Sequence, residues 1–392
     1  ARQLMRPLAV RGSAGVSTEL AVRHLHGAPG QAATALCGIV ASTALMIAMA
    51  VMVTSFRIAV DDWLQDVLSA DLYMRVDGGA GFDPAAQRLL AATPGVAEIV
   101  FMRQIPLTIA PDEPPLSLQA RPITKDWAGD SMMQASSDPA PTGFVPVWIS
   151  EPAARLHGWR IGDRLNLPIG HGARFVVMGI WRDYARQQGA ATIDSADYDR
   201  LTGDVDRHLA AVTLVPGASA QRVTEALGAR LPAALIGTVG IKDTRTLRRE
   251  VLKLFDRSFA VTYVLEGISI VVGLIGVGAT MSAQTIARSR EFGMLRHIGL
   301  GKRQIIAMLA SEGALLGLVG GLAGIFLGGI MAQVLIHVIN PQSFNWTMTT
   351  RWPVGMMISV AGALIVASAG TAILAGRRAI ATDAVRAVRE DW

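Results

Sequence analysis

The stretch "ARSREFGMLRHIGLGKRQI", residues 287–305, is a short basic segment between two of the most apolar runs of the chain. Basic side chains beside long apolar runs are typical of the cytoplasmic ends of membrane-spanning helices. The segment therefore predicts a membrane protein with this loop on the cytoplasmic side. The basic residues of the stretch are Arg288, Arg290, Arg296, Lys302 and Arg303.

The composition also favours a membrane protein. The chain has 392 residues, of which 51% are hydrophobic and only 17% are charged, whereas soluble domains contain about a quarter charged residues. Its net charge of +5 does not indicate nucleic acid as a partner, because the basic residues cluster at the edges of apolar runs. The single cysteine, Cys37, excludes a disulfide within the chain. Because the chain begins with Ala1 rather than Met, we expect a fragment or half of a longer protein.

Four apolar runs are long enough to cross the ~30 Å hydrocarbon core as helices, which takes about 20 residues. The third run is longer than one crossing needs, so we expect it to tilt, to bend at its glycines or to extend beyond the bilayer. The four predicted spans are residues 32–56, 259–281, 305–339 and 353–375.

The distribution of Lys and Arg predicts the orientation of these spans. Basic residues are concentrated in the lead-in 1–31, in the loop 282–304 and in the tail 376–392, whereas the short loop 340–352 carries only Arg351. Both termini and the 282–304 loop are therefore predicted to be cytoplasmic. The 340–352 loop is predicted to be a short external loop.

The long insertion 57–258 is then predicted to lie outside the membrane. Alternating or branched apolar runs predict strands in it, and capped amphipathic stretches predict helices. We therefore expect a large mixed α/β extracytoplasmic domain between the first and second of four transmembrane helices. The strands are expected at 70–76, 96–110, 173–181 and 210–216, and the helices at 83–95 and 219–232.

Both ends of this domain have the helical spacing of apolar residues, which predicts that the first two spans continue outward as a helical stalk. The alternative is a pair of short connector helices. The apolar positions are Val60, Trp63, Leu64, Val67 and Leu68 after the first span, and Leu247, Val251 and Leu254 before the second.

No motif in the sequence indicates catalysis. The nearest candidate for a nucleotide-binding loop, "GLGKRQ", lacks the earlier glycine and the Ser or Thr that should follow its Lys302. The histidines have no metal-ligand spacing. We therefore expect no catalytic residue, no metal site and no cofactor bound by this chain.

Two carboxylates, Glu266 and Glu312, lie inside predicted spans. A membrane carboxylate is costly to bury, so each is either paired structurally or part of a transport path. The third span also carries small residues at four-residue spacing, which lets helices approach closely in lipid. This pattern fits packing within one bundle, a subunit interface or a sliding face. The glycines are Gly313, Gly317, Gly320, Gly321, Gly324 and Gly328.

The 287–305 stretch and the span after it resemble the FtsX-like permease family, the permeases of type VII ABC transporters. The family pattern is Arg-x-Arg-Glu-apolar-Gly-x-Leu-Arg-x-x-Gly, followed by a glycine-rich span that opens near a Glu-Gly pair. The tail departs from the family, because Ala381–Thr382–Asp383–Ala384 differs from the usual Ile-Asp-Pro and the Pro is missing. The matching residues are Arg288, Arg290, Glu291, Phe292, Gly293, Leu295, Arg296 and Gly299, with Glu312 and Gly313 as the pair.

The resemblance implies that 287–301 is a coupling helix that lies on a partner ABC ATPase, with Phe292, Leu295 and Ile298 on its apolar side. ATP and Mg²⁺ would bind to that partner, so this chain would be no enzyme. The implied partners are the ATPase, a second permease half or subunit, and a periplasmic accessory protein. The implied location is the bacterial inner membrane. The chain would be the C-terminal half of a longer two-half permease.

The implied function is to couple ATP hydrolysis to movement of the extracytoplasmic domain, for export or extraction of a hydrophobic compound, lipid or lipoprotein. The alternatives are an FtsX-type regulator of an envelope enzyme that transports nothing, and a membrane-anchored enzyme. The absence of a nucleophile–base set in the sequence disfavours the last.

Overall fold

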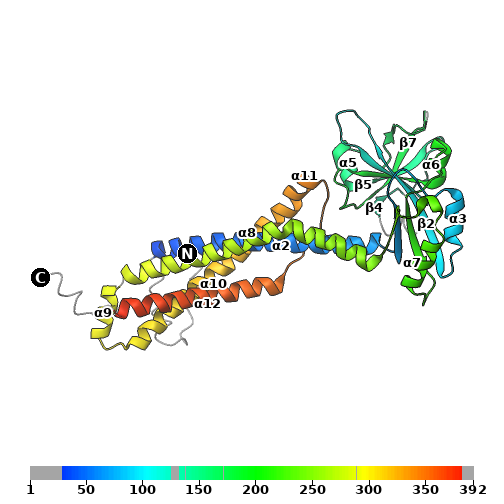
Figure 1. The fold of residues 1–392 in the computed structure, drawn as a ribbon. Coiled ribbons are helices and arrows are strands. Elements are labelled where there is room, and N and C mark those ends of the chain that lie inside the picture. Colours follow the sequence, from blue (N-terminus) through cyan, green and yellow to red (C-terminus); the bar gives the residue numbers. More distant parts are fainter. Residues whose placement is uncertain (1–28, 125–131, 137, 171, 288, 382–392) are drawn as a thin grey trace. The chain divides into compact units, whose positions relative to one another are not determined.

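The computed structural model describes residues 29–381 except 125–131, 137, 171 and 288 (Figure 1). The predicted cytoplasmic lead-in and most of the tail therefore fall outside the described residues. Within this range the chain forms long helices and one mixed sheet, which confirms the prediction of apolar helices combined with an α/β domain.

The described chain divides into two compact units, each built from segments that are distant in the sequence. The first, which we call the helical unit, contains the residues up to Phe56, Arg257–Val338 and those from Thr349 onward. The second, the sheet unit, contains Arg57–Asp256 and Ile339–Met348. The short connection between the third and fourth predicted spans thus belongs to the sheet unit.

The helices of the helical unit follow the apolar runs of the sequence, since a helix satisfies its own backbone hydrogen bonds in lipid. Two of them, α2 and α8, continue past the helical unit into the sheet unit, and η3 is a π-helical turn. The helices are α2 (Pro29–Val67), α8 (Thr244–Ala287), α9 (Ser289–His297), α10 (Lys302–Val334), η3 (Leu335–Ile339), α11 (Asn340–Phe344) and α12 (Val354–Ala381).

Within the part of the chain that the structure describes, three helical stretches are long and apolar enough to cross a membrane. They overlap the first, third and fourth predicted spans, so the protein is a membrane protein. The second predicted span, 259–281, falls within α8, and a fourth crossing there stays a prediction. The three stretches are Leu36–Val67, Lys302–Phe344 and Val354–Arg377.

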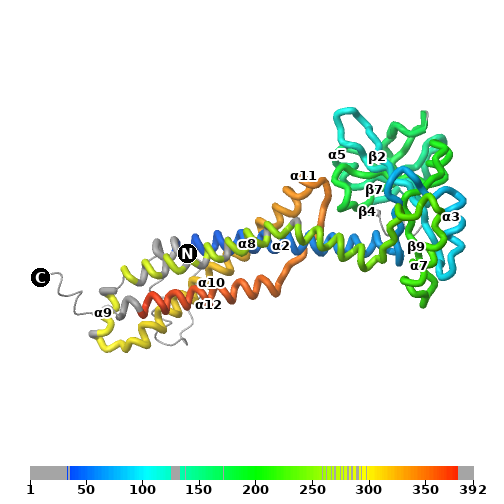
Figure 2. Tube along the Cα trace, viewed as in Figure 1, coloured from blue at the N-terminus to red at the C-terminus, as the bar shows by residue number. Residues whose placement is uncertain are grey.

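The core of the helical unit is formed by α2, α9, α10 and α12, and α10 and α12 lie side by side (Figure 2). Lipid provides no hydrophobic drive between such helices, so close van der Waals contact has to hold them together. The buried residues of this core are Leu36, Ile39, Phe292, Ile305, Met308, Leu309, Leu316, Val319, Leu364 and Ala372.

In the sheet unit, ten described strands form a single mixed sheet in the order β10-β1-β9-β2-β3-β8-β5-β7-β4, with β6 paired to β7. The strands and helices predicted from the sequence are all present. The strands are β1 (Leu72–Val76), β2 (Val96–Leu107), β3 (Leu116–Arg121), β4 (Met132–Ala135), β5 (Val145–Ser150), β6 (Arg164–Leu165), β7 (Phe175–Trp181), β8 (Ala190–Asp194), β9 (Leu209–Leu214) and β10 (Val239–Asp243). The helices are α3 (Pro84–Ala91), α5 (Glu151–His157), α6 (Ser195–Thr202), α7 (Ala220–Ala229) and the short η2 (Ala233–Leu235).

The sheet has two lobes, each with its own apolar core, and the long strand β2 belongs to both. Its first half, up to Met102, pairs with β9, and its second half, from Arg103, pairs with β3. In the first lobe, α3 and α7 pack on β1 and β9 (Figure 1). In the second lobe, α5 and α6 pack on β3, β5, β7 and β8. A single strand therefore connects the two lobes through the middle of the sheet.

The sheet-unit ends of α2 and α8 are joined by a two-pronged ion pair. Arg248 on α8 donates from Nη2 to both carboxylate oxygens of Asp61 on α2, at 2.6 and 2.7 Å. The predicted apolar face of α2 is buried at Trp63 and Leu64. On α8 the face is less buried than predicted, because Leu254 is 66% exposed. Both helices extend beyond the helical unit, and their role as a stalk stays a prediction.

Candidate functional site

The basic segment between α8 and α10 forms the nine-residue helix α9, which ends as the sequence predicted. Gly299 adopts a φ of +103°, where a residue with a Cβ would be strained. Its N–H donates to the carbonyl of Arg296 at 3.1 Å, and the N–H of Leu300 donates to the carbonyl of Leu295 at 3.0 Å. The glycine therefore closes the helix and turns the chain toward α10.

The predicted apolar face of α9 needs a correction. Phe292 is only 2% exposed and belongs to the core of the helical unit, and Leu295 packs against that core. These two residues therefore hold α9 to its own unit, because a helix this short needs tertiary contacts to be stable. The exposed apolar side chains of the segment are Met294 at 62% and Ile298 at 79%. The sequence did not indicate Met294, because the spacing of apolar residues does not show which face of α9 is covered by other helices.

Two charged residues of the same segment, Glu291 and Arg296, are also exposed. Arg288 lies outside the described residues, and so do the side chains of Arg290 and Glu266. An exposed apolar patch edged by charge suits a protein contact better than plain topological anchoring, for which charge alone is sufficient.

The glycines of α10 divide into two sets that face different helices. Two of them approach α12: a Cβ on Gly313 would lie 2.5 Å from the carbonyl oxygen of Ser368, and one on Gly317 would lie 3.0 Å from the backbone of Ile365. A real Cβ does not come as close to a backbone atom as 2.5 Å, so the α10–α12 contact requires glycine at Gly313, whereas at Gly317 a Cβ would be tight.

The second set approaches α2. A Cβ on Gly324 would lie 2.5 Å from the Cβ of Thr43, and one on Gly328 would lie 2.6 Å from the carbonyl oxygen of Ala44. Gly320 is similarly close to Ile39, at 2.7 Å. These glycines pack within the bundle, which was one of the three interpretations left open by the sequence.

Gly321 differs from the other glycines of α10 that the sequence singled out. A Cβ at this position would meet only Leu364, at an ordinary 3.7 Å. The regular four-residue spacing therefore includes one position at which glycine is not required by contact. The same helix buries Glu312 to 6% exposure, and the choice between structural pairing and a transport role for this carboxylate stays a prediction.

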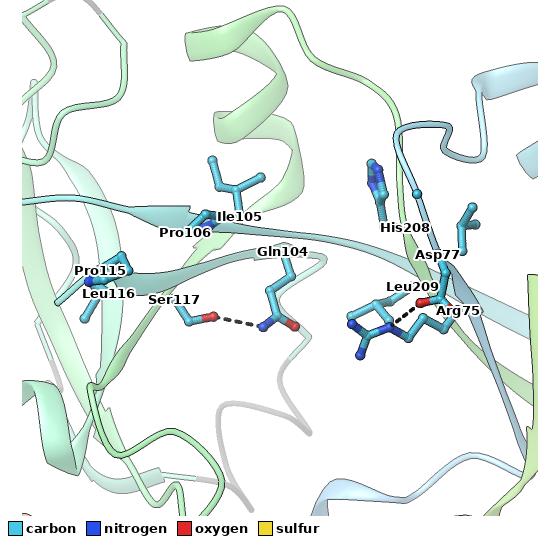
Figure 3. Close-up of a pocket in the computed structure, with 12 residues that line it drawn as sticks. Arg75, Asp77, Gln104, Ile105, Pro106, Pro115, Leu116, Ser117, His208 and Leu209 are labelled. Carbon is cyan, nitrogen blue, oxygen red and sulfur yellow. Dashed lines mark hydrogen bonds and ion pairs between the residues drawn. The ribbon is translucent and has the colours of Figure 1, made fainter. Parts of the chain in front are cut away.

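A cavity of about 390 Å³ lies in the sheet unit where β2 passes from the first lobe to the second. In the described strand pairs, the part of β2 from Gln104 to Leu107 pairs with β3 alone, so its other edge is open. Figure 3 shows Gln104 donating to Ser117, at 3.1 Å, and Arg75 paired with Asp77, at 3.2 Å. These contacts are exposed to solvent.

His208 borders the same cavity and contacts the Arg103 guanidinium, which is also paired with Asp204 at 2.8 Å. Burial, together with the positive charge of Arg103, lowers the pKa of His208 below its usual 6.5, although Asp204 and Asp206 oppose this shift. The folded domain therefore favours the neutral ring.

This shift predicts that acid destabilises the protein through His208. The unfolded chain binds a proton at this residue at a higher pH than the folded chain does, so the free energy of unfolding falls as pH drops below 6.5 toward the folded pKa. Thermal unfolding of the purified chain at about pH 7.5 and about pH 5.5 should show this loss, and His208→Gln should reduce the difference. An equal pH dependence in His208→Gln would contradict the assignment.

Among the residues that the structure describes, no three His, Cys, Asp or Glu side chains lie close enough to hold a metal ion. Three features remain as candidates for a functional role: the helix α9, the glycine contacts of α10 and the ion-paired ends of α2 and α8.

Comparison with known proteins gives these features a context. Residues 263–384 match the family described as FtsX-like permease C-terminal. The chain is 28% identical over 347 residues to an uncharacterized ABC transporter permease protein of Mycobacterium tuberculosis, covering 84% of this chain and 40% of the relative. It is 27% identical over 138 residues to the macrolide export ATP-binding/permease protein MacB of Rhodopirellula baltica, covering 35% of this chain and 19% of the relative.

Among solved structures, the periplasmic region of MacB from Actinobacillus actinomycetemcomitans is similar over 48% of this chain and 95% of its own, with a TM-score of 0.36 and 10% identity. The chain spans only part of its relatives' length. It covers 40% of the relative from Mycobacterium tuberculosis and 51% of an uncharacterized ABC transporter permease from Methanocaldococcus jannaschii.

Proposed function

Because residues 263–384 form an FtsX-like permease domain and the homologues are ABC transporter permeases, we propose that this chain is the transmembrane permease component of an ABC transporter with a separate ATPase. ATP and Mg²⁺ bind to that partner. The chain sits in the bacterial inner membrane with both termini in the cytoplasm, and a second permease half completes the transporter.

The observation that carries this proposal is the construction of α9 inside the matched domain. Buried Phe292 fixes the helix to its own unit, while Met294 and Ile298 remain exposed beside charged residues. A segment that transmits force needs both properties, a firm attachment on one side and a contact surface on the other. We assign the exposed side to the ATPase.

The same proposal gives α2 and α8 the role of carrying movement to the sheet unit. Each is an unbroken helix that begins in one unit and ends in the other, and α8, with 44 residues, is about 66 Å long at 1.5 Å per residue. The ion pair between Arg248 and Asp61 holds the two helices together beyond the helical unit. The movement drives export or extraction of a hydrophobic compound such as a lipid or lipoprotein.

Affinity purification of the tagged chain from native membranes, in mild detergent, tests this function. We expect an ABC ATPase to copurify and the complex to hydrolyse ATP in a vanadate-sensitive manner. A wild-type preparation that contains no ATPase contradicts the proposal. An envelope hydrolase that copurifies with the ATPase, and is activated by ATP, would instead identify the chain as a regulator that transports nothing.

A further inference from the structure

The segment Ile339–Met348, which we call the connecting segment, links α10 to α12 along the chain and yet is part of the sheet unit. The sequence predicted only a short external loop here. Its contacts within the sheet unit are with residues more than 150 positions away, since Tyr184 and Glu151 are separated from Thr347 by 163 and 196 positions. The segment is therefore docked on the second lobe.

An aromatic side chain anchors the segment. Trp346 is 2% exposed and is among the largest fully buried side chains of the protein. Its ring lies edge-on to that of Tyr184, with 4.6 Å between the ring centroids. Tyr184, in the loop after β7, is itself buried. Aromatic side chains bury about 150–250 Å² each, so Trp346 gives the segment a large apolar contact.

Both backbone groups of the next residue, Thr347, are bound by side chains of the second lobe. The Tyr184 hydroxyl donates to the Thr347 carbonyl at 3.1 Å, and the Thr347 N–H donates to Oε2 of Glu151 at 3.1 Å. Burial raises the pKa of Tyr184 to about 12, so its hydroxyl keeps the proton that it donates. Glu151 is 5% exposed, and its other oxygen accepts from Arg155 at 3.2 Å. These are hydrogen bonds in a water-poor site, where losing a partner is costly.

Hydrogen bonds within the connecting segment hold Trp346 in position. The side-chain amide of Asn340 donates to the Trp346 carbonyl at 2.9 Å. Asn345 adopts a left-handed φ of +59°, a conformation that asparagine tolerates better than most residues. Its N–H donates to the carbonyl of Pro341 at 3.1 Å and closes α11.

The loop that receives Trp346 also contacts the end of α2. The indole N–H of Trp63 donates to the carbonyl of Arg182 at 3.0 Å, and its ring lies 5.8 Å from that of Tyr184. Tyr184 therefore contacts both the connecting segment and a stalk helix.

We propose that the connecting segment is a second mechanical link between the membrane helices and the sheet unit, with Trp346 and Thr347 clamped by Tyr184 and Glu151. The four are positioning residues. Displacement of α10 or α12 then moves the second lobe directly, in addition to movement carried by α2 and α8. The proposal rests on the proposed function, because it concerns how the movement driven by ATP is divided between two connections.

Hydrogen–deuterium exchange on the complex of the full chain with its copurified ATPase tests the clamp. In Trp346→Ala, exchange across 339–348 should accelerate about tenfold or more, and in Tyr184→Phe, which removes a single donor, a few-fold. Trp352→Ala is the matched control, since Trp352 is 48% exposed and belongs to the helical unit. Exchange across 339–348 should be unchanged in this control.

The same measurement follows the movement, by comparing the nucleotide-free complex with the complex trapped by ATP and vanadate. In the wild type, trapping should alter exchange in both 182–186 and 244–256. In Trp346→Ala the response of 182–186 should become clearly smaller, because only the contact with Trp63 of α2 then reaches this loop. In Tyr184→Phe the reduction should be less, and the response of 244–256 should remain in both variants.

Three results would overturn the proposal in different ways. Unchanged exchange across 339–348 in Trp346→Ala would show that the segment is not clamped. A response of 182–186 in that variant as large as in the wild type would show that the clamp adds nothing to the movement carried by α2. A wild-type preparation without an ATPase would contradict the proposed function itself, and the mechanical role would fall with it, although exchange across 339–348 would still report the docking.

Discussion

Gly324→Ala is expected to leave the helical unit less stable than Gly321→Ala on the same helix by about 1–3 kcal/mol. The added Cβ at Gly324 would lie 2.5 Å from the Cβ of Thr43, but at Gly321 its nearest neighbour, in Leu364, is 3.7 Å away. Forcing extra atoms into a packed contact costs about 1–3 kcal/mol. Both changes gain about 1 kcal/mol of helix propensity, so the difference between the variants isolates the close approach of α10 to α2.

The abundance of each variant in the membrane fraction and its unfolding temperature in detergent measure this effect. Gly324→Leu should be worse than Gly324→Ala, because a branched side chain cannot be accommodated by a small shift. Equal stability of Gly324→Ala and Gly321→Ala would mean that α10 and α2 do not pack as closely as 2.5 Å implies.

Ile298→Asp is expected to reduce the copurified ATPase at least about tenfold while leaving the abundance of the chain near normal. Ile298 is 79% exposed, so the change costs the fold little. At a contact with the ATPase, however, it would bury an unpaired carboxylate at a cost of several kcal/mol, and each ~1.4 kcal/mol is a factor of ten in binding. Met294→Asp should act in the same way, because Met294 is 62% exposed.

Leu295→Asp provides the contrast, because Leu295 packs against the core of the helical unit. It should lower the abundance of the chain itself, whereas Ile298→Leu should resemble the wild type in both measurements. Normal copurification of the ATPase with Ile298→Asp would leave α9 as a topological anchor only.

The sequence by itself determined where the membrane helices and the α/β domain lie, because both depend on local patterns. Unbroken apolar runs predicted α2, α10 and α12, and alternating apolar residues predicted strands such as β1 and β9. Gly299 marked the end of α9 because the local backbone there requires a glycine. The FtsX-like motif was also within reach of the sequence, because its residues are contiguous in the chain.

Only the tertiary structure decided which face of each element is covered and by what. Phe292 and Ile298 are equally apolar in the sequence, yet one is 2% exposed and the other 79%, because other helices pack on one side of α9 only. Likewise Gly321 and Gly324 share one helical pattern but differ in how closely the neighbouring side chain approaches them, Leu364 in one case and Thr43 in the other. The docking of Trp346 and Thr347 on Tyr184 depends on residues 163 positions apart, and such long-range contacts leave no periodic signal in the chain.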